Sequence, residues 1–308
     1  MSIEVFVLGT GGMMPLPGRN LTSVMLRREG ELFLFDCGEA TQIAIRKLNL
    51  KWKKISTIFI THTHADHITG LPGILMLSSQ VDREEPLNII GPPKTKEYVE
   101  ANMRILEMYI NYEINVLEFT QPGIVYEGNG FKVKSIQLNH SKLCMGYTLE
   151  EEMRPGVFFP EKALSLGVPK GPLWSNLQNG INVPLPDGNI VKPSDVMGGK
   201  RLGKKFSFIV DTVPVKGLSE FVNQSDLLIC EGMFAGDLLA SAAEKKHLTS
   251  GQAAEIAKNG NVKKMGLIHY SPRYAGKELK KLLKEAREIF PETFLTKEGQ
   301  IIKLPNLD

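Results

Sequence analysis

The sequence predicts an α/β protein in which helices pack against sheets, with one loop-rich insertion. Apolar runs rich in Val, Ile and Phe recur along the 308 residues, and helical patterns separate several of them. With 42% hydrophobic and 23% charged residues, the chain can bury a substantial core. Disordered and collagen-like classes are therefore excluded.

Short apolar runs are expected to form strands, because they are enriched in β-branched and aromatic residues. These runs span residues 3–8, 32–36, 55–60, 87–90, 131–138, 206–210, 226–230 and 265–268. Helices are expected where apolar residues recur at spacings of three and four. The helical segments run from Glu39 to Leu48, Lys94 to Ile110, Thr249 to Asn259 and Lys277 to Ile289.

Residues 154–200 differ in composition from the rest of the chain. They contain seven prolines and seven glycines, against 18 prolines and 29 glycines in all 308 residues. So long a stretch is unusual as a plain connection between elements. Because it also has apolar residues to pack, such as Phe158, Leu164 and Trp174, we expect an inserted flexible arm over residues 151–200. The whole chain, residues 1–308, is otherwise expected to be a single domain.

Several classes of protein are excluded by simple patterns. No apolar run approaches the roughly 20 residues of a membrane-spanning helix. The N-terminus lacks a basic region before its apolar run, so a cytoplasmic location is expected. Cys37, Cys144 and Cys230 fit neither a disulfide framework nor a zinc ribbon and are expected to be buried thiols. The net charge of +3 does not identify a partner.

The motif His62-Thr63-His64-Ala65-Asp66-His67 carries the strongest chemical signal. It holds three of the chain's six histidines and directly follows a strand-like run. In an extended loop, side chains two residues apart share a side, so His62, His64 and Asp66 can converge, and a turn brings His67 nearby. Imidazole and carboxylate groups are ligands that Zn²⁺ accepts. The motif therefore predicts a metal site, although a polar surface loop is the alternative.

Other apolar strands also end in groups that can bind metal or transfer protons, namely His140, Asp211, Glu231 and His269. Taken singly, each is more often a capping or hydrogen-bonded residue. Together with the motif, they supply five histidines and two aspartates as candidate ligands. This number suits two metals if one carboxylate bridges them, and paired metals serve phosphoester hydrolysis.

The run Gly9-Thr10-Gly11-Gly12 follows the first expected strand. A glycine-rich loop of this kind can cradle a phosphate. Here it lacks the lysine and the serine or threonine of a P-loop, so a turn from strand to loop is expected instead.

These motifs resemble the metallo-β-lactamase superfamily and, more narrowly, the short-form ribonuclease Z family of tRNA 3′-processing endonucleases. The resemblance rests on residues 8–11, 35–42, 62–67, 139–140, 211–212 and 269–274. It implies a four-layer αββα sandwich with metals at one edge of two sheets and a protruding Pro/Gly-rich arm. The implied activity is hydrolysis that removes the 3′ trailer from precursor tRNA and leaves a 3′-hydroxyl on the tRNA.

The resemblance also implies roles for individual residues. One Zn²⁺ per subunit would be held by His62, His64 and His140, a second by Asp66, His67 and His269, and both by Asp211. The implied catalytic residues are Asp66, His247 and Glu231, with Asp36 orienting a ligand histidine. The implied contacts to precursor tRNA are Arg19, Asn20, Ser271, Arg273, Gly171 and Pro172. A homodimer is implied as well, and no membrane contact.

Two other functions fit part of the sequence. A hydrolase of the same superfamily that acts on a small or cyclic phosphodiester would share the metal residues but would not need the arm. A non-catalytic RNA-binding subunit would be expected to lack metal residues, and this chain has all of them.

Overall fold

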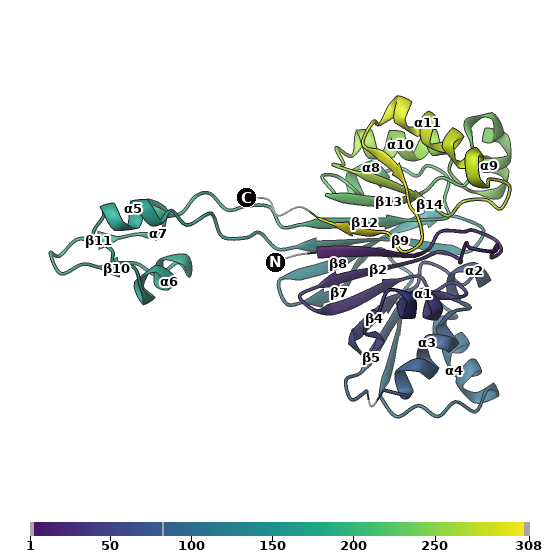
Figure 1. Cartoon of the computed structure of the whole chain (residues 1–308), viewed down its shortest axis with the longest axis horizontal. Coiled ribbons are helices and arrows are strands. Elements are labelled where there is room, and N and C mark those ends of the chain that lie inside the picture. Colours follow the sequence, from purple (N-terminus) through teal and green to yellow (C-terminus); the bar gives the residue numbers. More distant parts are fainter. Residues whose placement is uncertain (1–2, 82, 305–308) are drawn as a thin grey trace. The chain divides into compact units, whose positions relative to one another are not determined.

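The computed structural model describes residues 3–81 and 83–304. These residues form two compact units, of which the smaller is Glu151–Gly203 and the larger comprises the described residues on either side of it. Two seven-stranded sheets belong to the larger unit, and a two-stranded hairpin belongs to the smaller one (Figure 1).

The first sheet has the order β16-β1-β2-β3-β4-β5-β6. Its strands are β1 (Ile3–Gly9), β2 (Ser23–Arg28), β3 (Glu31–Phe35), β4 (Ile55–Phe59), β5 (Leu87–Gly91), β6 (Ile114–Glu118) and β16 (Ile301–Lys303). Strands β3 and β4 run parallel, with Phe35 opposite Phe59. Their carboxyl ends therefore meet at one edge, which places Asp36 beside the loop that carries the histidine motif.

The second sheet has the order β15-β14-β13-β12-β9-β8-β7. Its strands are β7 (Gly123–Gly128), β8 (Phe131–Asn139), β9 (Leu143–Glu151), β12 (Lys205–Ile209), β13 (Leu227–Glu231), β14 (Met265–Ile268) and β15 (Thr293–Leu295). Strands β12, β13 and β14 are parallel, so Asp211, Glu231 and His269 gather at the same edge. A bridge between Asn139 and Val213 brings the end of β8 to that edge too.

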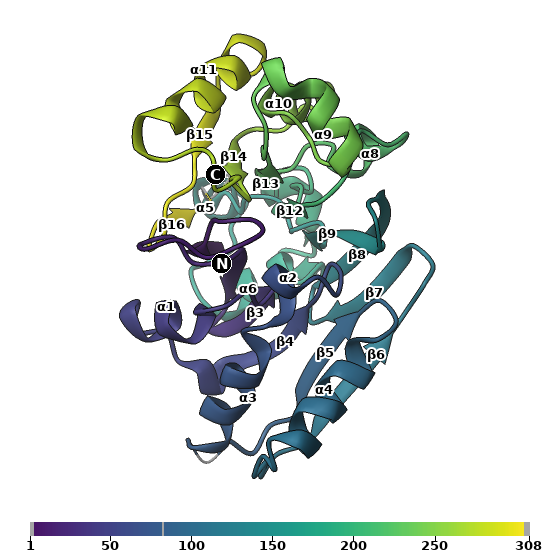
Figure 2. The ribbon, with the colours of Figure 1, turned by 90° about the vertical axis from the view of Figure 1, so that its right-hand side faces the viewer.

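Helices cover the outer face of each sheet in the larger unit (Figure 2). Those near the first sheet are α1 (Thr41–Lys47), η1 (Trp52–Lys54), α2 (Ala65–Ile68), α3 (Leu71–Ser79) and α4 (Thr95–Ile105). Those near the second are α8 (Leu218–Phe221), η2 (Gly236–Leu238), α9 (Leu239–Lys245), α10 (Ser250–Asn259), η3 (Gly276–Glu278) and α11 (Leu279–Ile289). The expected four-layer αββα arrangement is thus confirmed.

The core between the two sheets is aromatic. Phe35 of the first sheet lies 5.2 Å, between ring centroids, from Phe206 of the second, and Phe59 lies 5.4 Å from Tyr147. All four side chains are fully buried. This buried aromatic interface packs the two sheets against each other and so fixes the edge at which their polar residues meet.

The smaller unit has secondary structure and an apolar core of its own. It contains α5 (Pro160–Ser165), α6 (Pro172–Gln178), β10 (Val183–Pro184), β11 (Ile190–Val191) and α7 (Pro193–Val196). Each helix begins with proline, whose fixed φ suits the first helical position. Its buried residues are Ala163, Val168, Leu177, Val183, Val191 and Val196, with Phe158 and Trp174 packed against them.

Some expected elements differ from those observed. The sequence did not indicate β2 and β9, whose residues SVMLRR and LCMGYTLEE alternate weakly. The helix expected to reach Ile110 ends at Ile105, because Glu107 adopts a left-handed φ of 46°. The three cysteines are free and buried, as predicted. Among the described residues, no helix is long and apolar enough to cross a membrane.

Candidate metal centre

The histidine motif lies partly in a loop and partly in a short helix. His62 follows β4, whereas Asp66 and His67 lie in α2, which begins directly after His64. The expectation of an extended loop with a turn was therefore wrong for the second half of the motif. Main-chain hydrogen bonds from Cys37 N–H to His67 O and from Gly70 N–H to Cys37 O, both 2.8 Å, hold α2 against the loop after β3.

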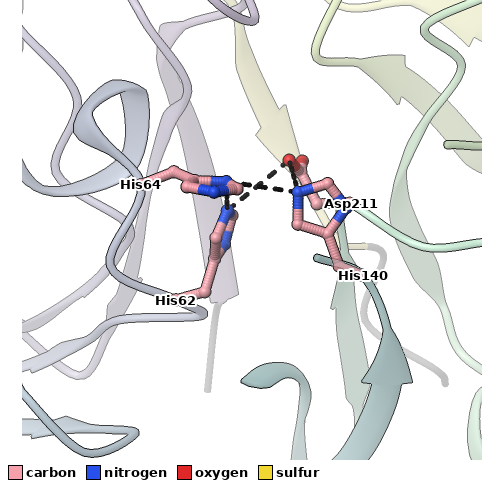
Figure 3. Close-up of side chains that lie close together, drawn as sticks. All are labelled: His62, His64, His140 and Asp211. Atoms are coloured by element: carbon pink, nitrogen blue, oxygen red, sulfur yellow. Dashed lines mark hydrogen bonds and ion pairs between the residues drawn. The ribbon is translucent and has the colours of Figure 1, made fainter. Parts of the chain in front are cut away.

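His62, His64 and His140 form what we call the first donor group. The Nδ1 atom of His64 lies 2.9 Å from Nε2 of His62 and 3.2 Å from Nε2 of His140. In Figure 3, His62 and His64 approach from one side and His140 and Asp211 from the other. Three imidazole nitrogens thus converge on one point.

Asp66, His67 and His269 form the second donor group. The Nε2 atoms of His67 and His269 are 3.1 Å apart. Oδ2 of Asp66 lies 3.3 Å from Nε2 of His269 and 3.6 Å from Nε2 of His67. One carboxylate and two imidazoles thus converge on a second point.

Asp211 lies between the two groups and is buried. Its Oδ2 atom is 3.6 Å from Nε2 of His62 and 3.5 Å from Nε2 of His140. Its Oδ1 atom is 3.5 Å from Nε2 of His67 and 3.2 Å from Nε2 of His269. The carboxylate therefore offers one oxygen to each group.

The donor spacing fits tetrahedral metal ligation. Ligand bonds of about 2.0–2.1 Å in a tetrahedron place ligand atoms about 3.3 Å apart, and the observed donor separations run from 2.9 to 3.6 Å. Oδ1 of Asp211 is buried and has no hydrogen-bond partner among the described residues. A buried, unsatisfied carboxylate oxygen costs free energy unless a cation neutralises it. The histidine and aspartate cluster is therefore suited to hold metal.

Ring nitrogens that face away from the donor points are mostly hydrogen bonded. Nδ1 of His67 contacts Oδ2 of Asp36 at 2.7 Å, and Nδ1 of His140 contacts the main-chain oxygen of Lys246 at 3.0 Å. Nδ1 of His62 lies 3.1 Å from Oγ1 of Thr61. Such contacts fix which nitrogen is free to bind a metal.

Burial and neighbouring charges favour the protonation states in which the histidines and Asp211 bind metals. Burial lowers the pKa values of His62, His64 and His140, so these rings are neutral near pH 7. Burial alone would raise the pKa of Asp211, but the neighbouring His269 and His67 outweigh it and lower the pKa. Neutral imidazole and ionised carboxylate are the forms that bind metals.

His67 differs from the first donor group. Burial alone would lower its pKa, but three carboxylates, of Asp211, Asp66 and Asp36, outweigh burial and raise the pKa well above its usual value. A cation at this point would therefore replace a proton.

His247 lies beside both donor groups. Its ring centroid is 5.1 Å from that of His140 and 5.5 Å from that of His269. Nδ1 lies 3.0 Å from Oε2 of Glu231, whose Oε1 accepts the Thr212 N–H at 2.6 Å. Burial alone would lower the pKa of His247, but Glu231 raises it to about 9. His247 is therefore protonated at neutral pH.

The residues expected to contact substrate have other partners in the structure. Asn20 donates its N–H to the Glu298 carboxylate and its Nδ2 to the Leu8 oxygen. The Arg19 guanidinium carbon lies 5.8 Å from the ring centroid of Tyr270, the residue after His269. These contacts place the Arg19 loop close to the second donor group.

On the other side of His269, the Arg273 Nε donates to Ser271 Oγ at 3.2 Å. The Arg273 guanidinium carbon also lies 5.0 Å from the Phe234 ring centroid. Gly171 and Pro172 belong to the smaller unit, where Pro172 begins α6. The structure thus brings all the candidate metal ligands together, whereas the residues expected to contact substrate are divided between the two units.

Several residues that the sequence did not single out also support the site. Thr61, Ser141, Thr212, Lys246 and Met13 contact ligands or Glu231 through hydroxyl or main-chain groups. Main-chain contacts leave little trace in residue type. The exception is Met13, which directly follows the glycine run Gly9–Gly12. The sequence predicts only a turn from strand to loop there.

Comparisons with known proteins are consistent with this geometry. The family model for the anti-Pycsar protein Apyc1 matches residues 3–153. The chain is 62% identical over 304 residues to a ribonuclease Z of Treponema denticola, covering 99% of both chains. It is 46% identical to a ribonuclease Z of Borrelia hermsii, covering 98% of this chain and 97% of that protein.

Solved structures show the same fold. The human short-form tRNase Z, ELAC1, superposes with a TM-score of 0.72 at 26% identity, covering 98% of this chain and 99% of that one. The metallo-β-lactamase fold protein YhfI of Bacillus subtilis gives a TM-score of 0.68 at 19% identity, covering 98% of this chain and all of that one. The chain therefore belongs to the ribonuclease Z family and is a hydrolase with the metallo-β-lactamase fold.

Proposed function

We propose that this protein is a zinc-dependent endoribonuclease that removes the 3′ trailer from precursor tRNA and leaves a 3′-hydroxyl. Its bacterial relatives carry the name ribonuclease Z, and its human structural neighbour is a tRNase Z. The observation that carries the proposal is the shared carboxylate of Asp211, which offers one oxygen to each donor group. Two such adjacent metal points are typical of phosphodiester hydrolysis.

The first zinc would be held by His62, His64 and His140, the second by Asp66, His67 and His269, and both by Asp211. When bound, paired zincs supply a nucleophile at neutral pH and neutralise charge on the phosphate. Asp36 holds the Nδ1 atom of His67, so that Nε2 faces the second zinc point.

His247 and Glu231 supply the proton that the reaction needs. Because Nδ1 of His247 is engaged by Glu231, Nε2 is the nitrogen that can reach the substrate. As the bond between phosphorus and the tRNA 3′-oxygen breaks, Nε2 donates its proton to that oxygen. Asp66 belongs to the second donor group and would orient the attacking water.

The smaller unit would bind tRNA outside the metal centre. Its exposed residues include Leu164 and Ile190, and the Lys162 ammonium lies 4.7 Å from the ring centroid of Phe159. Apolar and cationic side chains together suit contacts to sugar, base and phosphate. We assign Gly171 and Pro172 to this arm and Arg19, Asn20, Ser271 and Arg273 to contacts near the cleaved bond. The homodimer and the cytoplasmic location stay predictions.

Incubation of a 3′-extended precursor tRNA with the zinc-loaded protein tests the reaction. Mapping both product ends should give a 3′-hydroxyl on the tRNA and a 5′-phosphate on the trailer. A small chromogenic phosphodiester, assayed in parallel, distinguishes the alternative function. Turnover of the small substrate without any cleavage of precursor tRNA would contradict the proposal.

Removing the centre of the arm, about residues 160–190, separates binding from chemistry. Precursor tRNA binding should weaken while the small phosphodiester is cleaved as before, because the metal ligands all lie in the larger unit. Equal loss on both substrates would show that the arm supports the larger unit instead.

A further inference from the structure

His269 is held differently from the other histidines of the metal centre. Its Nδ1 atom is buried and, among the described residues, has no hydrogen-bond partner. Gly12 instead lies directly against its ring, so that a Cβ at position 12 would be 2.5 Å from Cε1 and 2.8 Å from Nδ1. The orientation of this ring therefore depends on packing against main chain.

The next residue, Met13, contacts the second donor group through its main chain. Its N–H donates to Oδ2 of Asp66 at 2.7 Å. Oδ2 is also the atom of Asp66 that faces His67 and His269. One short segment therefore touches two members of the same donor group.

This segment is a strained turn. Met13 has a φ of 68°, and the Met14 N–H donates to the Gly12 oxygen at 2.9 Å. A hydrogen bond between residues i and i+2 across a residue of positive φ defines a γ-turn of the rare, strained kind. Non-glycine residues persist in such conformations where the surroundings enforce them, often at functional sites.

The surroundings of the turn are main-chain contacts to the strand end that carries His269. The Gly12 N–H donates to the Tyr270 oxygen at 3.1 Å, and the Tyr270 N–H donates to the Thr10 oxygen at 2.9 Å. The Met13 side chain is 55% exposed and so contributes little packing. The strained backbone at Met13 therefore directs its N–H group toward Asp66.

We propose that the Gly12–Met14 turn is the positioning element of the second metal point. Gly12 fixes the ring of His269 by close packing, in place of the hydrogen bond that its Nδ1 lacks. Met13 fixes the carboxylate of Asp66 by its N–H. The inference rests on the proposed function only in that the second donor group binds zinc.

Substitutions at Met13 test the main-chain role. Glycine and asparagine adopt positive φ readily, whereas a β-branched residue does not. Met13→Gly and Met13→Asn should keep both zincs, and Met13→Val should weaken the second zinc by about 10–100-fold, the usual effect of losing an orienting contact. Chelator competition measures each affinity without RNA, and His269→Ala identifies which zinc is the second.

Equal zinc affinities in Met13→Gly and Met13→Val would overturn the proposal, because the backbone conformation would then be irrelevant. If Met13→Val fails to fold, the α-hydroxy analogue of methionine at position 13 replaces the N–H by an ester oxygen and keeps the side chain, although it also weakens the Gly12 oxygen as an acceptor for the Met14 N–H. The ester should weaken the second zinc and leave the first unchanged. An ester protein with wild-type affinity for both zincs would also overturn the proposal.

Gly12→Ala tests the packing role. The added methyl group should displace the His269 ring and weaken the second zinc by at least about 10-fold. Gly251→Ala is the matched control, because its Cβ would meet only ordinary contacts, the nearest at 3.5 Å from Ile289. Unchanged zinc binding in Gly12→Ala would refute the packing role. A wild type that binds two zincs without cleaving precursor tRNA would contradict the proposed function and leave this inference standing.

Discussion

The two donor groups of the metal centre have similar ligands but are held in different ways. In the first group, the outer nitrogens of His62, His64 and His140 all have partners, at 3.1, 3.4 and 3.0 Å. In the second group, His67 is held by Asp36, whereas His269 has no partner on its outer nitrogen among the described residues. The first group is thus oriented by hydrogen bonds. In the second group His67 and Asp66 are also held by hydrogen bonds, whereas His269 is oriented by packing.

Backbone strain follows the same division. None of the three histidines of the first group has a positive φ, whereas His269 of the second group has a φ of 60° and Asp36, the partner of His67, has a φ of 54°. Asp211, which the two groups share, has a φ of 52°. Conformations of this kind cost about 1–3 kcal/mol each and need enforcing surroundings. The second group therefore depends more than the first on strained main chain and on close packing around His269. It should therefore be more sensitive than the first to small steric changes.

The largest effect should come from removing the residue that the two groups share. Asp211→Ala should lower the occupancy of both metal points and reduce phosphodiester turnover by about 10³-fold or more. His269→Ala should mainly empty the second point. Elemental analysis of each purified variant provides the measurement, and two full zincs in Asp211→Ala would contradict the bridging role.

His247 adjoins both groups, so its loss should affect chemistry while leaving both metals bound. His247→Ala should reduce turnover by about 10²–10⁴-fold, the usual range for a lost acid or base, with little change in precursor tRNA affinity. Binding measured by filter retention and turnover measured separately provide the check. If the affinity for precursor tRNA fell by as large a factor as turnover, His247 would be assigned to substrate binding.

The pH profile sharpens the role of His247. Because Glu231 raises the pKa of His247 above its usual value, the imidazolium should be present at neutral pH, and turnover should fall as the pH rises through that raised pKa. Since this folded-state pKa is raised above the usual 6.5, the stability from the Glu231 contact should likewise be present below 6.5 and lost as the pH rises through about 9. Glu231→Gln should move the alkaline fall of turnover to lower pH. An unchanged profile in that variant would exclude His247 as the titrating acid.

Asp36→Asn should weaken the second zinc by about 10–100-fold, as expected when the partner of a ligand histidine is altered. The side-chain amide in this variant has only one acceptor oxygen, whereas the Asp36 carboxylate uses both oxygens to accept from Thr61 and His67. The first zinc should be nearly unaffected. Chelator competition that shows equal weakening of both zincs would contradict the division into two separately held groups.

The smallest effect should come from Ser141→Ala. Ser141 Oγ lies 3.4 Å from Nε2 of His64, a long contact at an exposed position. Because the other two histidines of the first group keep their partners, the first zinc should weaken by no more than about threefold. A tenfold loss in the same assay would show that the Ser141 hydrogen bond holds the first group more strongly than proposed.

The sequence alone predicted much of the fold and indicated the candidate ligands. Local periodicity indicated β4, β8, β12 and β14, whose ends carry the histidines and Asp211, because the alternation of buried residues is a property of neighbouring positions. The dense motif from His62 to His67 predicted a metal site because few other roles bring three histidines together. Proline and glycine content set residues 154–200 apart from the rest of the chain for the same local reason.

Only the tertiary structure decided how these residues are oriented. The Met13 N–H reaches Asp66 across 53 residues of sequence, and the Lys246 oxygen reaches His140 across 106. The end of α4 before the left-handed Glu107 and the left-handed φ of Asp211 were equally invisible. Main-chain groups and φ angles of this kind carry no residue-type signature, since every amino acid except proline has the same N–H and carbonyl groups. Their directions are set by packing between distant segments, which exists only in the folded chain.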